Sequence, residues 1–145
     1  MNKKITTLVT ALALTVPMAV SAQDRWEMQV RAQMVGVWVT AAREGYRLNE
    51  RLLVGSLQGG HLATLDLTFQ RGVDYLLVAT CDADCDDVDL VLREEQGREI
   101  AADRDSNDLA VLRVPGGHTG LHRLNIPMAS CSANPCRYGV AIFTR

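Results

Sequence analysis

The sequence predicts a mainly β fold, an antiparallel β-sandwich or barrel with one N-terminal α-helix. After Gly45, short apolar runs alternate with polar residues, and clusters of turn-forming residues separate the runs. No helical periodicity appears between these runs, as is typical of sandwiches and barrels. Before Gly45, apolar residues instead recur at the three- and four-residue spacing of a helix.

Residues 1–22 have the form of a secretory signal peptide. Lys3 and Lys4 precede an apolar run that extends to Val20, and the small residue Ala22 follows it. A transmembrane helix is the alternative, but it needs about 20 apolar residues and has no small-residue cleavage site. We therefore expect an exported chain, periplasmic or secreted, that begins at Gln23 and has no membrane span after signal cleavage.

The size and charge of the mature chain argue against some classes of partner, nucleic acid above all. Removal of residues 1–22 from the 145-residue chain leaves 123 residues, enough for one domain with its own core. Both lysines leave with the signal, so 13 arginines remain against 17 acidic residues, a net charge near −4. A weakly acidic domain of this kind is not expected to bind nucleic acid.

Residues 23–46 are predicted to form the helix, with Gly45 as its stop signal. Two interpretations of its apolar stripe stay open. The stripe packs against the rest of the domain, or its aromatic residues Trp26 and Trp38 bind a partner. The stripe comprises Trp26, Val30, Met34, Val37, Trp38 and Ala41.

Residues 47–145 are predicted to form the sandwich as one domain of seven or eight strands. Each predicted strand is a short apolar or alternating run, and each is closed by a turn signal such as Gly59-Gly60. The predicted strands are 52–57, 63–69, 75–81, 88–92, 100–102, 109–114, 122–128 and 138–142.

The four cysteines predict disulfides, because they are even in number and follow an export signal. Four cysteines allow three pairings. Cys81 with Cys85 and Cys131 with Cys136 each bracket a local turn, so these local pairs are favoured over cross-pairing. Redox catalysis is not expected, because an acidic surrounding raises a thiol pKa where catalysis needs it lowered.

The stretch "CDADCDDVDL" carries Asp82, Asp84, Asp86, Asp87 and Asp89. Clustered carboxylates repel one another unless something neutralises them, and calcium prefers oxygen ligands of this kind. The glycine and terminal glutamate of an EF-hand loop are missing, however. We therefore favour a solvated acidic turn, keep calcium as the alternative, and expect no other cofactor.

Three further features point away from catalysis. The loop "DRDSND" at 103–108 resembles half of a calcium loop but is expected to connect two strands. His118 and His122 would lie about 13 Å apart on a strand, too far for one metal ion, so His122 is expected at the core edge. No G-x-S-x-G nucleophile motif is present, and we expect no enzyme activity.

Two stretches within residues 72–143 each carry one cysteine pair, "GVDYLLVATCDADCDDVDLVLREEQG" and "GGHTGLHRLNIPMASCSANPCRYGVAIF". With these stretches, residues 72–143 resemble the bacterial pre-peptidase C-terminal domain. It implies a jelly-roll-like β-sandwich without catalysis, of a type that accompanies secreted peptidases or binds extracellular polymers. At the closing strand, His122 stands where such domains usually have tyrosine.

Together these observations predict a non-catalytic exported binding or accessory module whose partner is a protein or an extracellular polymer. The alternative is a structural envelope protein that self-associates through its N-terminal helix. A small secreted enzyme is the third interpretation.

Overall fold

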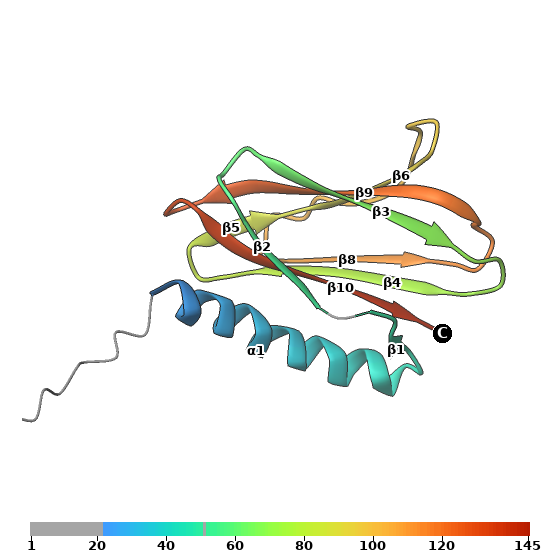
Figure 1. The fold of residues 1–145 in the computed structure, drawn as a ribbon, viewed down its shortest axis with the longest axis horizontal. Coiled ribbons are helices and arrows are strands. Elements are labelled where there is room, and N and C mark those ends of the chain that lie inside the picture. Colours follow the sequence, from blue (N-terminus) through green and yellow to red (C-terminus); the bar gives the residue numbers. More distant parts are fainter. Residues whose placement is uncertain (1–21, 51) are drawn as a thin grey trace, which may run out of the picture.

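The computed structural model describes residues 22–50 and 52–145, and it confirms the predicted β-sandwich with one helix. Helix α1 (Ala22–Arg43) lies along the outer face of one of two stacked antiparallel sheets (Figure 1). The molecule therefore has three layers: the helix, a first sheet beneath it, and a second sheet. The predicted signal peptide falls outside the described residues, apart from Ala22.

The first sheet has the strand order β1-β10-β4-β8, and β2 also pairs with β10. The second has the order β3-β9-β6-β7, and β5 also pairs with β9. The first sheet comprises β1 (Arg47–Leu48), β2 (Leu53–Leu57), β4 (Tyr75–Cys81), β8 (Leu109–Val114) and β10 (Cys136–Thr144). The second comprises β3 (Leu62–Phe69), β5 (Cys85–Val88), β6 (Leu90–Glu94), β7 (Glu99–Asp103) and β9 (Gly120–Cys131).

Strand β4 is buried along its whole length, because it separates two hydrophobic cores. Its residues Leu77 and Ala79 face the core between the sheets. Leu76 and Val78 face a second core under α1, together with Phe143 and other residues. Because both faces of β4 carry apolar residues, both faces must be covered. The second sheet covers one face, and helix α1 covers the other.

The helix ends at Arg43, earlier than the predicted range 23–46. The N–H of Tyr46 donates to the carbonyl of Ala41, and the N–H of Gly45 donates to the carbonyl of Ala42. This is a Schellman motif, and Gly45 adopts the left-handed conformation that it needs, with φ of 85°. Tyr46 therefore lies beyond the helix and packs its side chain into the core under α1.

Helix α1 approaches the sheet closely at Gly139 in β10. A Cβ atom at this position would lie 2.6 Å from Cγ1 of Val30. The Thr80 hydroxyl also donates to Oε1 of Gln33 at 2.9 Å, which joins the middle of the helix to β4. Glycine at 139 therefore sets the spacing between the helix and the sheet.

Candidate binding surface around helix α1

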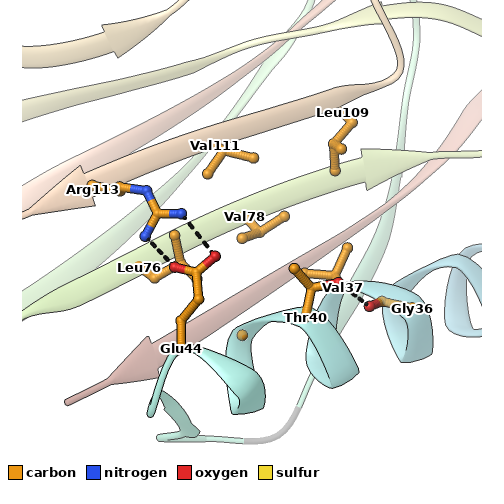
Figure 2. A pocket seen from close by; sticks show the side chains of 10 residues that line it. Gly36, Val37, Thr40, Glu44, Leu76, Val78, Leu109, Val111 and Arg113 are labelled. Atoms are coloured by element: carbon orange, nitrogen blue, oxygen red, sulfur yellow. Dashed lines mark hydrogen bonds and ion pairs between the residues drawn. The ribbon is translucent and has the colours of Figure 1, made fainter.

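A groove runs between α1 and the edge strand β8 (Figure 2). Its volume is about 320 Å³, and it is open to solvent along one side. The walls are mostly apolar, as in sites that receive apolar groups of a ligand or partner. The lining residues include Val37, Thr40, Val78, Leu109 and Val111, with Glu44 and Arg113 at one end.

At that end of the groove, Glu44 and Arg113 form a bidentate ion pair (Figure 2). The guanidinium of Arg113 donates to the two carboxylate oxygens of Glu44 at 2.7 and 3.2 Å. These hydrogen bonds lower the pKa of Glu44 and raise that of Arg113. The groove thus offers an apolar wall and a fixed charged end, but no nucleophile beside a base.

A second, smaller groove of about 230 Å³ lies on the other side of α1. Trp38 and Arg31 form its helix side, and Leu48, Leu52 and Phe143 form its sheet side. Apolar surface therefore flanks the helix on both sides. Such exposed apolar surface is typical of a site that another macromolecule covers.

The prediction that both tryptophans share one packed stripe is wrong. Val30, Met34 and Ala41 are buried, whereas 52% of Trp38 is exposed. Twelve residues at 3.6 per turn place Trp38 about 120° around the helix from Trp26. Trp26 is half-buried, with the guanidinium carbon of Arg25 4.6 Å from its ring centroid. A role of either ring in partner binding stays a prediction.

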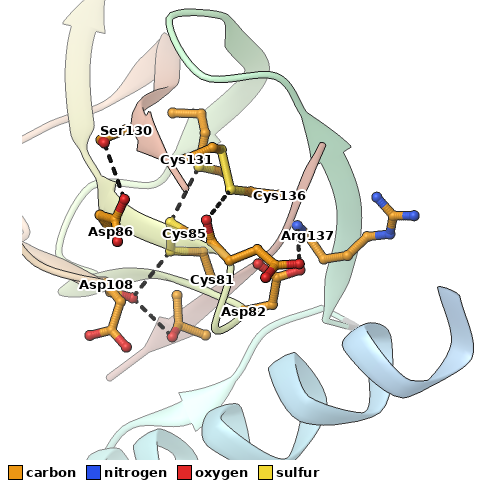
Figure 3. Close-up of a disulfide and its surroundings, with 12 residues drawn as sticks. Cys81, Asp82, Cys85, Asp86, Asp108, Ser130, Cys131, Cys136 and Arg137 are labelled. Atoms are coloured by element: carbon orange, nitrogen blue, oxygen red, sulfur yellow. Dashed lines mark hydrogen bonds between the residues drawn. A yellow bond between two sulfur atoms is a disulfide. The ribbon is translucent and has the colours of Figure 1, made fainter. Parts of the chain in front are cut away.

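The two disulfides are Cys81–Cys85 and Cys131–Cys136, the favoured local pairs (Figure 3). They lie side by side because Cys85 in β5 is opposite Cys131 in β9. Two disulfides in a domain of this size are characteristic of exported proteins. They fix two neighbouring turns at the same end of the sandwich.

The acidic stretch is folded against this disulfide corner. Asp82 is fully buried. Its Oδ2 accepts the N–H of Arg137 at 2.8 Å, and its own N–H donates to the Arg137 carbonyl at 2.9 Å (Figure 3). Burial raises the pKa of Asp82, and the nearby charge of Asp84 adds to the shift. Asp86 is exposed and accepts the Ser130 hydroxyl at 3.3 Å.

Within residues 22–50 and 52–145, no three His, Cys, Asp or Glu side chains are placed to hold a metal ion. Asp87 and Asp89 are half-buried, and Oδ1 of each is buried without a hydrogen-bond partner. Burial also raises the pKa of Asp89. The acidic turn is therefore less solvated than expected, and calcium binding stays a prediction.

The loop 103–108 connects β7 to β8, as expected, and it also covers the edge of β8. Oδ2 of Asp103 accepts the N–H of Val111 at 2.8 Å, and Oδ1 of Asn107 accepts the N–H of Leu109 at 2.9 Å. Strand β8 does not use these two N–H groups in its pairing with β4. The polar loop residues therefore accept hydrogen bonds from N–H groups at the sheet edge that would otherwise have no partner.

His122 occupies the core edge, as predicted. It is 5% exposed, and its ring stacks on Phe69 with 4.6 Å between centroids. The predicted distance to His118 is wrong, because His118 lies in the turn before β9, which begins at Gly120. The two histidine rings lie 5.8 Å apart in an edge contact.

Sequence reasoning missed the groove residues Glu44, Val111 and Arg113. Glu44 and Arg113 are 69 residues apart in the chain, so no local pattern joins them. One signal was available in the continuous apolar run of residues 75–81, which requires a cover on both faces of that strand. The predicted helix was the only candidate for the outer cover.

Fold and surface together define a helix-covered β-sandwich with a candidate protein-binding groove. No protein-family profile matches the chain, and no curated protein matches its sequence. Among solved structures, the fold is similar to that of Aeromonas hydrophila PliG, a periplasmic lysozyme inhibitor of g-type lysozyme. The TM-score is 0.50 at 11% sequence identity, over 66% of this chain and 85% of the other.

Within residues 22–50 and 52–145, no helix has both the length and the hydropathy of a membrane span.

Proposed function

We propose that this chain is an exported, non-catalytic binding module of the pre-peptidase C-terminal type, active in the periplasm or outside the cell. In this proposal the groove between α1 and β8 receives an apolar loop of another exported protein. The groove carries the proposal, because it joins an open apolar wall to a fixed charged end at Glu44 and Arg113.

Three observations support a protein as the partner. The wall residues Leu109 and Val111 are partly exposed on an edge strand, where a loop of a second protein has access. The bidentate Arg113 site fits a carboxylate that competes with Glu44, and such a group would fix the orientation of the loop. The sandwich fold is also that of an inhibitor that acts on g-type lysozyme.

A photo-crosslinking residue at Thr40 tests the groove in the producing bacterium. Thr40 is exposed on the groove wall, so we expect one adduct with a second, different protein. The same residue at Thr68, exposed on β3 of the other sheet, is the positional control. Equal adducts from both positions, or none from Thr40, would contradict the proposal.

Occupancy of the groove is tested with two variants of the same residue. Thr40→Trp fills the groove, whereas Thr40→Ala removes only the γ-methyl group and the hydroxyl that donates to the Gly36 carbonyl. Using the crosslinked protein once identified, and g-type lysozyme as the first purified probe, we expect Thr40→Trp to weaken binding at least about tenfold and Thr40→Ala to leave it unchanged. Equal affinity of both variants would place the partner elsewhere.

The second candidate function is a structural envelope protein that self-associates through α1. The apolar residues exposed on the outer side of the helix favour it, since 63% of Met28 and 56% of Val35 are open to solvent.

A further inference from the structure

Helix α1 has a second apolar face, opposite the one that packs on the sheet. Met28, Ala32, Val35, Val39 and Ala42 follow one another at alternating four- and three-residue spacing, and all five are exposed. We refer to these five residues as the outer seam. The buried residues Val30, Met34 and Ala41 and the half-buried Val37 lie on the other side of the helix.

A helix that only covers a sandwich needs one apolar face. The alternating spacing of the outer seam is instead that of a helix that packs against a second helix, knobs into holes. In Figure 1 helix α1 lies at the periphery of the molecule, and the seam residues are exposed. A second helix therefore has access along its length.

The composition of the seam favours a helix over a lipid surface. Ala32 and Ala42 contribute little apolar area, and a Cβ atom at the adjacent Gly36 would meet nothing within 4 Å. Small residues allow two helix backbones to approach closely. A helix that lies on a membrane instead presents large apolar residues along its face.

The seam is complementary to itself in the antiparallel direction. When Ala32 is placed opposite Val35 of a second copy, Met28 falls opposite Val39 of that copy. Four of the five seam residues then set a larger side chain against a smaller one, as close packing requires, whereas Ala42 falls opposite Arg25. Antiparallel helices also align their macrodipoles favourably.

The flank of the seam adds a cation and an aromatic ring, and the cation, Arg31, is also paired with Glu27 of the same helix at 2.6 Å. Arg31 and Trp38 lie on the same side of α1, where they line the smaller groove. In the antiparallel arrangement Arg31 of each copy falls beside Trp38 of the other, so two-fold symmetry makes two cation–π contacts. A second copy would also cover the exposed half of Trp38.

We propose that two copies of this chain associate through the outer seam, with their α1 helices antiparallel. The larger groove, which Thr40 and Val111 line, lies on the other side of the helix from Trp38. It therefore stays open in the dimer. The proposal is therefore independent of the partner proposed for that groove, and it rests on the second candidate function, self-association through α1. Failure of one leaves the other standing.

Sedimentation of the mature, oxidised protein tests the association. We expect a dimer at about 100 μM and at least a tenfold weaker association for Val35→Arg. Leu62→Arg is the matched control, because Leu62 is equally exposed but lies on β3 of the other sheet. A monomeric wild type, or a Val35→Arg variant as dimeric as the control, would overturn the proposal.

Two measurements distinguish loss of the dimer from loss of the fold and from binding to a membrane. Unchanged thermal melting of Val35→Arg shows that loss of the dimer is not loss of the fold. Co-sedimentation of a monomeric wild type with phosphatidylglycerol vesicles would assign the seam to a membrane instead and overturn the proposal.

Mixed crosslinking tests the direction of the helices. Chains with Ala32→Cys and chains with Val35→Cys should form a disulfide with each other more readily than Val35→Cys forms with itself. A parallel pair would place Val35 opposite Val35, so preferential self-crosslinking of Val35→Cys would reject the antiparallel arrangement.

Discussion

A single glycine decides how closely the helix packs. Because a Cβ atom at Gly139 would overlap Val30, we expect Gly139→Ala to destabilise the protein by about 1–3 kcal/mol in denaturant unfolding. Combining it with Val30→Ala removes the overlapping methyl group, so the double variant should lose less than the sum of the two single losses. Simple additivity would show that the helix does not rest on this contact.

Asp82 should make stability depend on pH in the direction opposite to a salt-bridged carboxylate. Its folded-state pKa is raised by burial, so the folded chain binds the proton more tightly than the unfolded chain. Its contribution to stability is therefore largest below the unfolded pKa of about 3.9 and declines as pH rises to the folded-state value. We expect Asp82→Asn to melt no lower than wild type at pH 7.

The Asp82 experiment has an internal control. Asparagine keeps the oxygen that accepts the Arg137 N–H, so the variant isolates the charge. The advantage of Asp82→Asn at pH 7 should shrink as pH falls towards about 4. A variant that is less stable at pH 7 would show that the ionised carboxylate stabilises the corner.

Calcium should have little effect on the melting temperature. We expect melting in about 5 mM calcium and in chelator to differ by less than about two degrees, with magnesium as the control for charge screening. A calcium-specific rise of about five degrees or more, lost in Asp84→Asn with Asp86→Asn, would instead establish a calcium site in the acidic turn.

Among the elements, the edge of β8 depends on the polar loop 103–108 that covers it. Asp103→Ala removes the acceptor of the Val111 N–H, so we expect a loss of about 2 kcal/mol in denaturant unfolding and increased aggregation. Asp105→Ala removes a carboxylate from the same loop and keeps the Asp103 acceptor, which makes it the charge-matched control. Equal losses in both variants would attribute the effect to net charge.

The whole molecule is a stack in which β4 and β10 contribute to two cores at once. Their alternate residues face the second sheet or the helix, so loss of the helix would expose Leu76, Val78 and Phe143 together. This arrangement gives α1 two roles: its inner face completes the fold, and its outer face and flanks form the candidate binding surfaces.

The pairing and oxidation of the four cysteines can be checked on the whole protein by peptide mapping. Trypsin should release Cys81 with Cys85 in one peptide, 72–93, and Cys131 with Cys136 in another, 124–137. Both peptides should resist alkylation until they are reduced. A disulfide-linked pair of these peptides would contradict the local pairing, and a free thiol would contradict full oxidation.

Much of the fold could be predicted from local patterns. The strand alternation at Val88, Leu90 and Leu92 correctly places these residues in the core. Proximity in the chain correctly favoured the two local disulfides, because each closes a short turn. The position of Trp38 was misjudged, since spacings of three and four residues alone do not separate two faces of one helix.

The sequence by itself determined the class of fold and the turn that ends the helix, and it favoured the local disulfide pairs, because each depends on residues close together in the chain. Only the tertiary structure decided which helix face is buried, that Asp82 turns inward to the Arg137 backbone, and that Glu44 meets Arg113 at the end of a groove. These contacts join segments separated by dozens of residues. Their geometry depends on how the layers stack, which no local pattern encodes.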